Sequence, residues 1–95
     1  MNLRFYIDPE TNEPHIFNHE VDADEVGEVL DNAGEDRPGR EGSRIALGKT
    51  AAGRYLRIIY VPDTEPGSAF VITAYDLKGK ALAAYRSRRR KKQKR

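Results

Sequence analysis

Basic and phenolic side chains in the second half of this chain are the groups that could do chemistry. Arg and Lys complement phosphate charge, and Tyr offers a stacking surface or an acid–base hydroxyl. RNA is cleaved without a metal if its 2′-hydroxyl loses a proton, the phosphorane charge is stabilised and the leaving oxygen gains a proton. Lys, Arg and Tyr can share these tasks. The residues concerned are Arg44, Lys49, Thr50, Arg54, Arg57, Tyr75, Lys78, Lys80, Tyr85, Arg86 and Arg88, and the basic run continues through Arg89 and Arg90.

Composition alone leaves two interpretations of these residues open, a nucleic-acid-binding surface and an ordinary solvated basic surface. Other chemistries lack their residues. The chain has no cysteine, P-loop, dinucleotide-binding glycine motif or nucleophile elbow. His15 and His19 have a spacing that could hold zinc on a helix, but no acidic zinc motif frames them. We therefore predict no metal site and no cofactor.

The charges of the chain divide sharply between its two parts. Residues 1–42 hold twelve acids and three arginines, a net charge of −9, whereas residues 43–95 hold fourteen basic residues and three acids, a net charge of +11. This division suggests that different faces meet different partners, or that one half covers the other.

Three short strands are predicted in the basic half, at 44–47, 55–61 and 69–75. They are rich in β-branched and aromatic residues, and glycine- and proline-containing turns separate them. Connections this short favour antiparallel pairing, so a three-stranded meander is expected. Leu56, Ile58 and Tyr60 alternate onto one face of the central strand, which we predict to be the core face.

The acidic half is predicted to supply one strand and one main helix. Leu3–Ile7 alternates like a strand, and Pro14 could open a helical turn through His15–His19. A helix follows an Asp22 or Asp24 cap, with Val26, Val29 and Leu30 as its apolar stripe and Val21 as a staple. Residues 35–42 are predicted to be a loop with nothing that could pack.

The C-terminal part is predicted to be a helix with Asp76 as its N-cap, followed by a disordered basic tail at 89–95. The expected fold is thus α+β: an antiparallel sheet of the N-terminal strand and the meander, packed with two to three helices in one domain, 1–88. No signal peptide or membrane helix is apparent, and we expect a cytoplasmic protein.

Several short motifs along the chain resemble those of the BrnT-type toxins of bacterial toxin–antitoxin systems, compact relatives of the RelE/ParE ribonuclease superfamily. The resemblance covers nearly the whole chain up to Arg88. The motifs are Phe5-Tyr6-Ile7-Asp8, Asn18-His19-Glu20-Val21, Glu25-Val26-Gly27-Glu28-Val29-Leu30, Ala46-Leu47-Gly48, Gly53-Arg54-Tyr55-Leu56-Arg57-Ile58-Ile59-Tyr60, Val71-Ile72-Thr73-Ala74-Tyr75 and Tyr85-Arg86.

The resemblance implies a RelE-like fold, metal-independent cleavage of RNA and a cognate antitoxin protein that buries the active face. Lys49 and Arg54 match basic positions of the family, and Tyr85 matches the tyrosine of its last helix. Tyr75 stands where the family has an arginine, and the Glu-Arg-Arg that follows in the family is replaced by Ala-Leu-Ala-Ala. Either Tyr75 takes a new role, or the activity is altered or absent.

The predicted catalytic residues are therefore Lys49, Arg54, Tyr75 and Tyr85, which should share one pocket. The predicted nucleic-acid-binding residues are Arg44, Arg57, Lys78, Lys80, Arg86, Arg88, Arg89 and Arg90. Two alternatives to an RNA-cleaving toxin remain. One is a non-catalytic nucleic-acid-binding module of the same fold, and the other is a protein-interaction domain whose acidic helix docks a basic partner.

Overall fold

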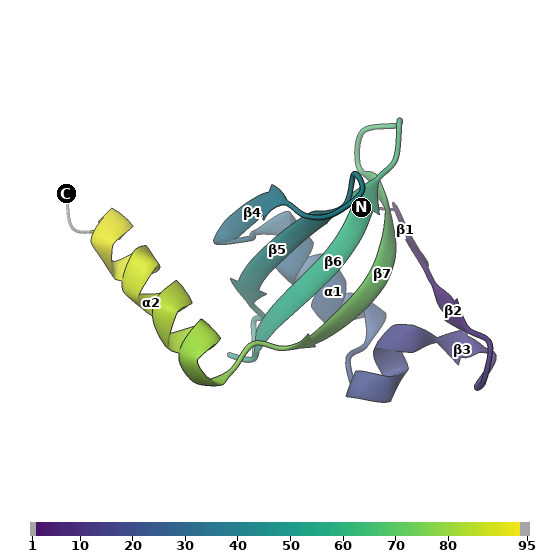
Figure 1. The fold of residues 1–95 in the computed structure, drawn as a ribbon, viewed down its shortest axis with the longest axis horizontal. Helices are drawn as coiled ribbons and strands as arrows, with labels where there is room; N and C mark the ends of the chain where they lie inside the picture. The colour runs from purple at the N-terminus through teal and green to yellow at the C-terminus, as the bar shows by residue number, and fades with distance from the viewer. Residues whose placement is uncertain (1, 94–95) are drawn as a thin grey trace.

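Three antiparallel strands form the middle of the protein, as the turn residues between them predict. The computed structural model describes residues 2–93. In it β5 (Arg44–Lys49), β6 (Tyr55–Pro62) and β7 (Ser68–Asp76) pair consecutively, and the whole sheet has the order β1-β7-β6-β5-β4 (Figure 1). The α+β class and the meander are confirmed. A RelE-like topology stays a prediction.

The first strand gives the sheet a parallel pair, so the prediction of an antiparallel sheet was wrong at this edge. β1 (Asn2–Phe5) pairs parallel with β7, with Asn2 opposite Ser68. Parallel pairing needs a long connection between its strands. Here five strands and two helices lie between β1 and β7 in the chain, so the connection is long enough. The result is a mixed five-stranded sheet.

A fifth strand, β4 (Glu35–Pro38), replaces the loop predicted at 35–42. It pairs antiparallel with β5 at the other edge of the sheet. Polar contacts rather than apolar packing hold it there, because Asp36 accepts hydrogen bonds from Arg44 Nε at 2.7 Å and from the Tyr60 hydroxyl. Hydrophobic periodicity cannot reveal a strand that is held in this way.

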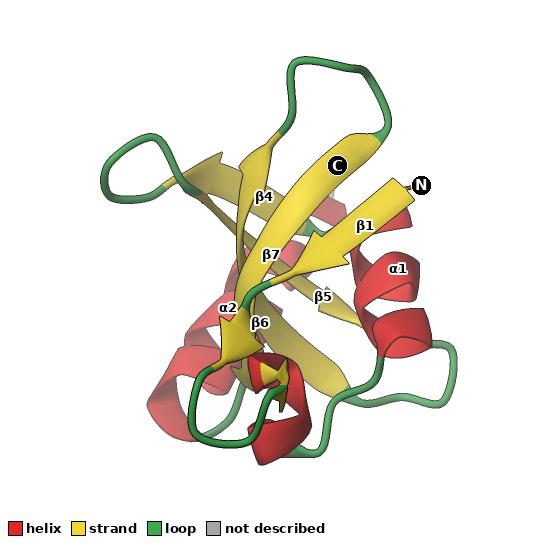
Figure 2. Cartoon of the chain, turned by 90° about the vertical axis from the view of Figure 1, so that its right-hand side faces the viewer, coloured by secondary structure: helices red, strands yellow, loops and turns green. Residues whose placement is uncertain are grey.

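The acidic half covers one face of the sheet. A small hairpin of β2 (Ile7–Asp8) and β3 (Glu13–Pro14) leads into the 3₁₀ helix η1 (His15–His19), the helical turn expected after Pro14. The helix α1 (Ala23–Asp31) has Asp22 as its N-cap, one of the two caps predicted, and Glu25 completes a capping box with it. Figure 2 shows α1 beside one face of the sheet.

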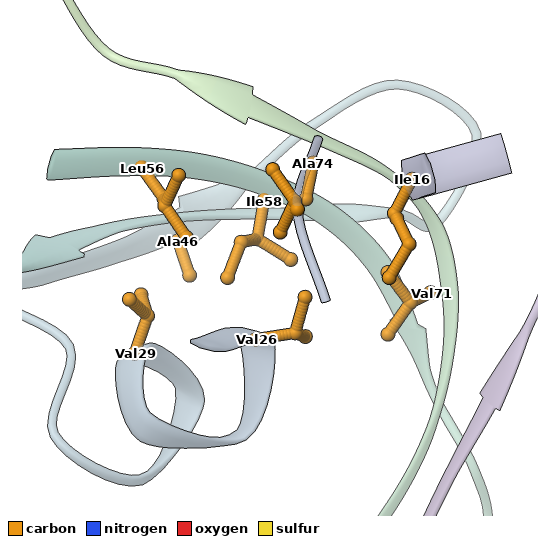
Figure 3. Packing of buried hydrophobic residues seen from close by; sticks show 9 residues of the cluster. Ile16, Val26, Val29, Ala46, Leu56, Ile58, Val71 and Ala74 are labelled. Atoms are coloured by element: carbon orange, nitrogen blue, oxygen red, sulfur yellow. The ribbon is translucent and has the colours of Figure 1, made fainter. Parts of the chain in front are cut away.

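The core lies between α1 and that face. Val26 and Val29 point from α1 towards Ala46, Leu56 and Ile58 of the sheet, as Figure 3 shows. These five side chains are fully buried. Tyr60 is partly buried against the same cluster, so the predicted core face of β6 is confirmed.

The second helix, α2 (Gly79–Gln93), stands beside the β4–β5 edge of the sheet (Figure 1). Asp76 is not its cap: this residue ends β7, and its carboxylate binds Arg54. The helix continues through residues 89–93, which we predicted to be disordered, and at its middle Arg88 donates to Glu35 of β4 and Arg89 to the carbonyl oxygen of Gly34. Lys94 and Arg95 lie outside the described residues.

None of the described helices is long and apolar enough to cross a membrane.

The other face of the sheet is covered only at one end. There Leu82 and Tyr85 of α2 pack with Leu47, Tyr55 and Leu77. Farther along, apolar side chains of the sheet remain half-buried with no described element across them. This open face, defined by the side chains of β5, β6 and β7 that point away from α1, carries the candidate sites described below.

Candidate nucleic-acid interface

A cleft opens where α2 meets the end of the open face. Its volume is about 400 Å³. β5 contributes Lys49 at its last position, and β6 contributes Tyr55, which lies directly opposite Lys49 in the pairing. The full lining is Asn32, Gly34, Lys49, Tyr55, Tyr85, Arg86, Arg89 and Arg90. Six of the eight lining residues are cationic or phenolic, and the lining contains no carboxylate.

Tyr55 forms the centre of this cationic cleft. Lys49 Nζ lies 5.8 Å and Arg86 Cζ 5.7 Å from the centroid of its ring, which are cation–π distances. Tyr85 meets the same ring edge-on, with 6.1 Å between the centroids. The cleft thus combines an aromatic platform with positive charge, the combination with which proteins stack bases and hold the phosphates of single strands.

Tyr85 is almost entirely buried, with 5% of its surface exposed. Burial raises the pKa of its hydroxyl above the ordinary value, with Arg89 opposing that shift. The hydroxyl therefore stays protonated around neutral pH. It can donate a hydrogen bond or a proton, but it is a poor base.

Two arginines on α2 hold the helix in place. Arg88 donates through Nε and Nη2 to the two carboxylate oxygens of Glu35, at 2.6 and 2.9 Å, and Arg89 donates to the carbonyl oxygen of Gly34 at 3.0 Å. The Arg88 hydrogen bond is the largest cause that lowers the pKa of Glu35. Gly34 is required here because a Cβ at this position would lie 2.0 Å from the Tyr85 hydroxyl oxygen.

Arg54, a predicted catalytic residue, does not reach the cleft. Its Nε donates to Asp76 at 2.7 Å, while Nη1 donates to Glu25 at 3.0 Å and to the carbonyl oxygen of Glu20 at 2.7 Å. A further bond joins Nη2 to the carbonyl oxygen of His19. Arg54 thus ties together the start of α1, the end of η1 and the end of β7. We call these contacts the Arg54 clamp.

Tyr75 lies on the open face but in a different hollow from Lys49 and Tyr85. It is opposite Arg57 in the pairing, and its ring meets the edge of His19 with 5.7 Å between centroids. His19 in turn contacts His15, whose Nδ1 lies 3.1 Å from Asp8 Oδ2. The hollow has a volume of about 350 Å³ and is lined by His19, Glu20, Tyr75, Asp76 and Lys78.

The single pocket predicted for the four catalytic residues therefore does not form. Lys49 and Tyr85 come together, whereas Arg54 and Tyr75 lie elsewhere. Of the predicted nucleic-acid-binding residues, Arg86, Arg89 and Arg90 line the cleft, and Arg88 supports it from the side. Arg44 is paired with Asp36, Arg57 faces another cavity, Lys78 lines the Tyr75 hollow, and Lys80 is exposed at the start of α2.

Tyr55, at the centre of the cleft, is a lining residue that sequence reasoning missed. The hairpin between β5 and β6 could have revealed it, because a turn over residues 50–54 places Lys49 opposite Tyr55. Among residues 2–93, no group of three or more His, Cys, Asp or Glu side chains is arranged to hold a metal ion.

Comparisons with protein-family models, with curated proteins and with solved structures found no match for this chain. The resemblance to BrnT-type toxins therefore rests on the motifs alone.

Proposed function

We propose that the protein binds RNA in the cationic cleft, with phosphates held by Lys49, Arg86 and Arg90 and a base stacked beside Tyr55. The proposal depends on one observation: acidic side chains do not neutralise the positive charges of these three residues. Within the described part of the chain, none of these three cations has an acidic partner within salt-bridge distance. Cations left free around an aromatic ring are suited to a polyanion. The choice of RNA over DNA rests on the resemblance to BrnT-type toxins, and so does the cytoplasmic location.

The test compares a double variant of the cleft with a control of equal charge. Lys49→Gln combined with Arg86→Gln should weaken binding of a fluorescent single-stranded RNA by about ten-fold or more. It should also lower the dependence of log affinity on log salt by about 1.4, since each lost phosphate contact on a single strand removes about 0.7.

The control combines Arg4→Gln with Arg40→Gln, which removes two exposed charges, one on β1 and one on the loop after β4, both outside the cleft. It should change RNA affinity and its salt slope much less than the cleft variant does. Equal losses in both double variants would show that only net charge matters, and the cleft proposal would fail.

A second candidate function, RNA cleavage by a toxin, is favoured by the meeting of Lys49 and Tyr85 in one cleft. Lys49 could stabilise the charge of the phosphorane, and the protonated Tyr85 hydroxyl could donate a proton to the leaving oxygen. A cognate antitoxin protein would then be the partner that covers the open face. Because Arg54 is bound by carboxylates, we no longer assign it a catalytic role.

Expression in bacteria tests this second function. The wild-type chain should arrest growth and cleave RNA, and Tyr85→Phe, which keeps the ring but removes the hydroxyl, should lose cleavage while retaining RNA binding. If the folded wild-type protein neither arrests growth nor cleaves RNA but binds it, the non-catalytic binding module is the correct function.

A further inference from the structure

Arg57 is a half-buried arginine whose side chain has no partner in residues 2–93. Its Nε is buried without a hydrogen bond, and the neighbouring Thr73 hydroxyl oxygen on the same face is also buried without one. Leaving such groups unpaired is costly, most of all for a charged donor. The other half-buried arginines all donate to an oxygen of this chain: Arg44, Arg54 and Arg89.

A cavity of about 710 Å³ lies over the open face at Arg57. Its walls are branched aliphatic side chains from three strands, and the loop between β4 and β5 forms its rim. The wall residues are Ile45, Ile59, Val61 and Ile72, and the rim runs from Pro38 to Ser43. A cavity of this size, mostly apolar and with few polar groups, is typical of sites for small organic molecules.

The net charge of the residues that line this cavity indicates what kind of ligand would fit it. Arg40 and Glu41 on the rim carry opposite charges, so the net charge of the lining is that of Arg57. A polyanion such as RNA would place several charges against aliphatic walls. A molecule with a single negative charge and an apolar body would satisfy both the guanidinium and the isoleucines.

We propose that this cavity binds an amphipathic monocarboxylate, with its carboxylate on the Arg57 guanidinium and its aliphatic or aromatic body against Ile45, Ile59 and Ile72. Arg57 does not line the cationic cleft, so the proposal is independent of RNA binding. The cavity also explains why the open face keeps apolar residues on both sides of a central arginine.

The experiment uses decanoate as the probe, below its micelle concentration, with binding followed by the backbone amide NMR signals of the full chain. Decanoate should shift the signals of β5, β6 and β7 around Ile45, Ile59 and Ile72 in a saturable way. Decanol, which has the same chain without the charge, should bind at least about ten-fold more weakly, because charge-assisted hydrogen bonds are the strong ones.

Arg57→Gln should weaken decanoate by at least about ten-fold and leave decanol unchanged, whereas Arg37→Gln, an exposed control, should change neither. Arg57→Lys keeps the charge without the planar fork, should weaken decanoate by a smaller factor, and serves if the Gln variant does not fold. Equal affinity of decanoate for the wild type and the Arg57 variants would overturn the proposal. So would unlabelled RNA that displaces decanoate in an Arg57-dependent way, since Arg57 would then belong to the RNA site.

Discussion

The Arg54 clamp and the cationic cleft use the same types of side chain for opposite purposes. Arg54 is surrounded by the carboxylates of Glu25 and Asp76 and by two carbonyl oxygens, so its charge is used within the molecule. Lys49 and Arg86 lie against an aromatic ring with no carboxylate beside them in the described structure. What distinguishes a structural cation from a binding cation here is therefore the partner and not the residue type.

The two regions also differ in how they depend on the acidic half of the chain. The clamp joins β7 to η1 and α1, and one acidic residue of the first half of the chain, Glu25, helps to neutralise a cation beside the meander. The cleft lies at the end of the sheet that α2 reaches, and its supporting acid, Glu35, binds Arg88 instead of a lining cation. The sharp charge division of the sequence is therefore partly cancelled inside the fold.

The largest expected effect comes from breaking the clamp. Arg54→Gln removes charge-assisted hydrogen bonds to two carboxylates and two carbonyls, and should lower the free energy of unfolding by about 2–3 kcal/mol. Urea denaturation measures this loss. The folded fraction should keep its RNA affinity. A variant of unchanged stability that no longer binds RNA would mean that Arg54 belongs to the binding site after all.

The next effect comes from the backbone beside the cleft. Gly34→Ala places a Cβ within 2.0 Å of the Tyr85 hydroxyl oxygen and 3.0 Å of its ring carbon Cζ. Tyr85 and α2 must shift, which should cost about 1–3 kcal/mol of stability by thermal denaturation and weaken RNA binding. Stability and RNA affinity that both match the wild type would show that α2 does not need this close contact.

The control for that change is Gly27→Ala in α1. A Cβ there would meet nothing within 4 Å. Alanine is favoured over glycine in a helix, so this variant should be more stable by about 0.5–1 kcal/mol with unchanged RNA affinity. A loss of stability would indicate that the surface of α1 is packed more closely than the structure shows.

The smallest effect concerns the support of the cleft at low pH. Arg88 lowers the pKa of Glu35 below its ordinary 4.5, so the unfolded state takes up the proton first as the pH falls. The contribution of this pair is present above pH 4.5 and is lost as the pH drops below it. Glu35→Gln should cost less than about 1 kcal/mol at pH 7, because Arg88 is partly exposed.

Denaturation between pH 7 and pH 3 measures this dependence. The wild type should lose stability more steeply than Glu35→Gln over the acidic part of the range. Identical curves for the two proteins would mean that the Arg88–Glu35 pair does not hold α2 against the sheet, and the support assigned to it would be wrong.

Local rules were sufficient for much of the fold. The glycine- and proline-rich turns predicted the meander, and an Asp22 or Asp24 cap before the apolar stripe predicted the start of α1. Alternation in β6 identified Leu56 and Ile58 as core residues. These features depend on residues close together in the chain, where backbone geometry and hydrogen bonding act directly.

The remaining features, which are the edge strands and the partners of the arginines, depend on contacts between residues far apart in the chain. They could be seen only in the folded structure. Pairing with β5 and the contacts of Asp36 hold a strand in a segment that lacks apolar periodicity, and the long path of the chain allows β1 to lie parallel to β7. Arg54 and Arg57 look alike in the sequence, yet one is neutralised by residues about twenty positions or more away and the other is left without a partner. The sequence determines whether a side chain is charged. Which groups neutralise that charge depends on the distant residues that the fold brings within hydrogen-bond distance.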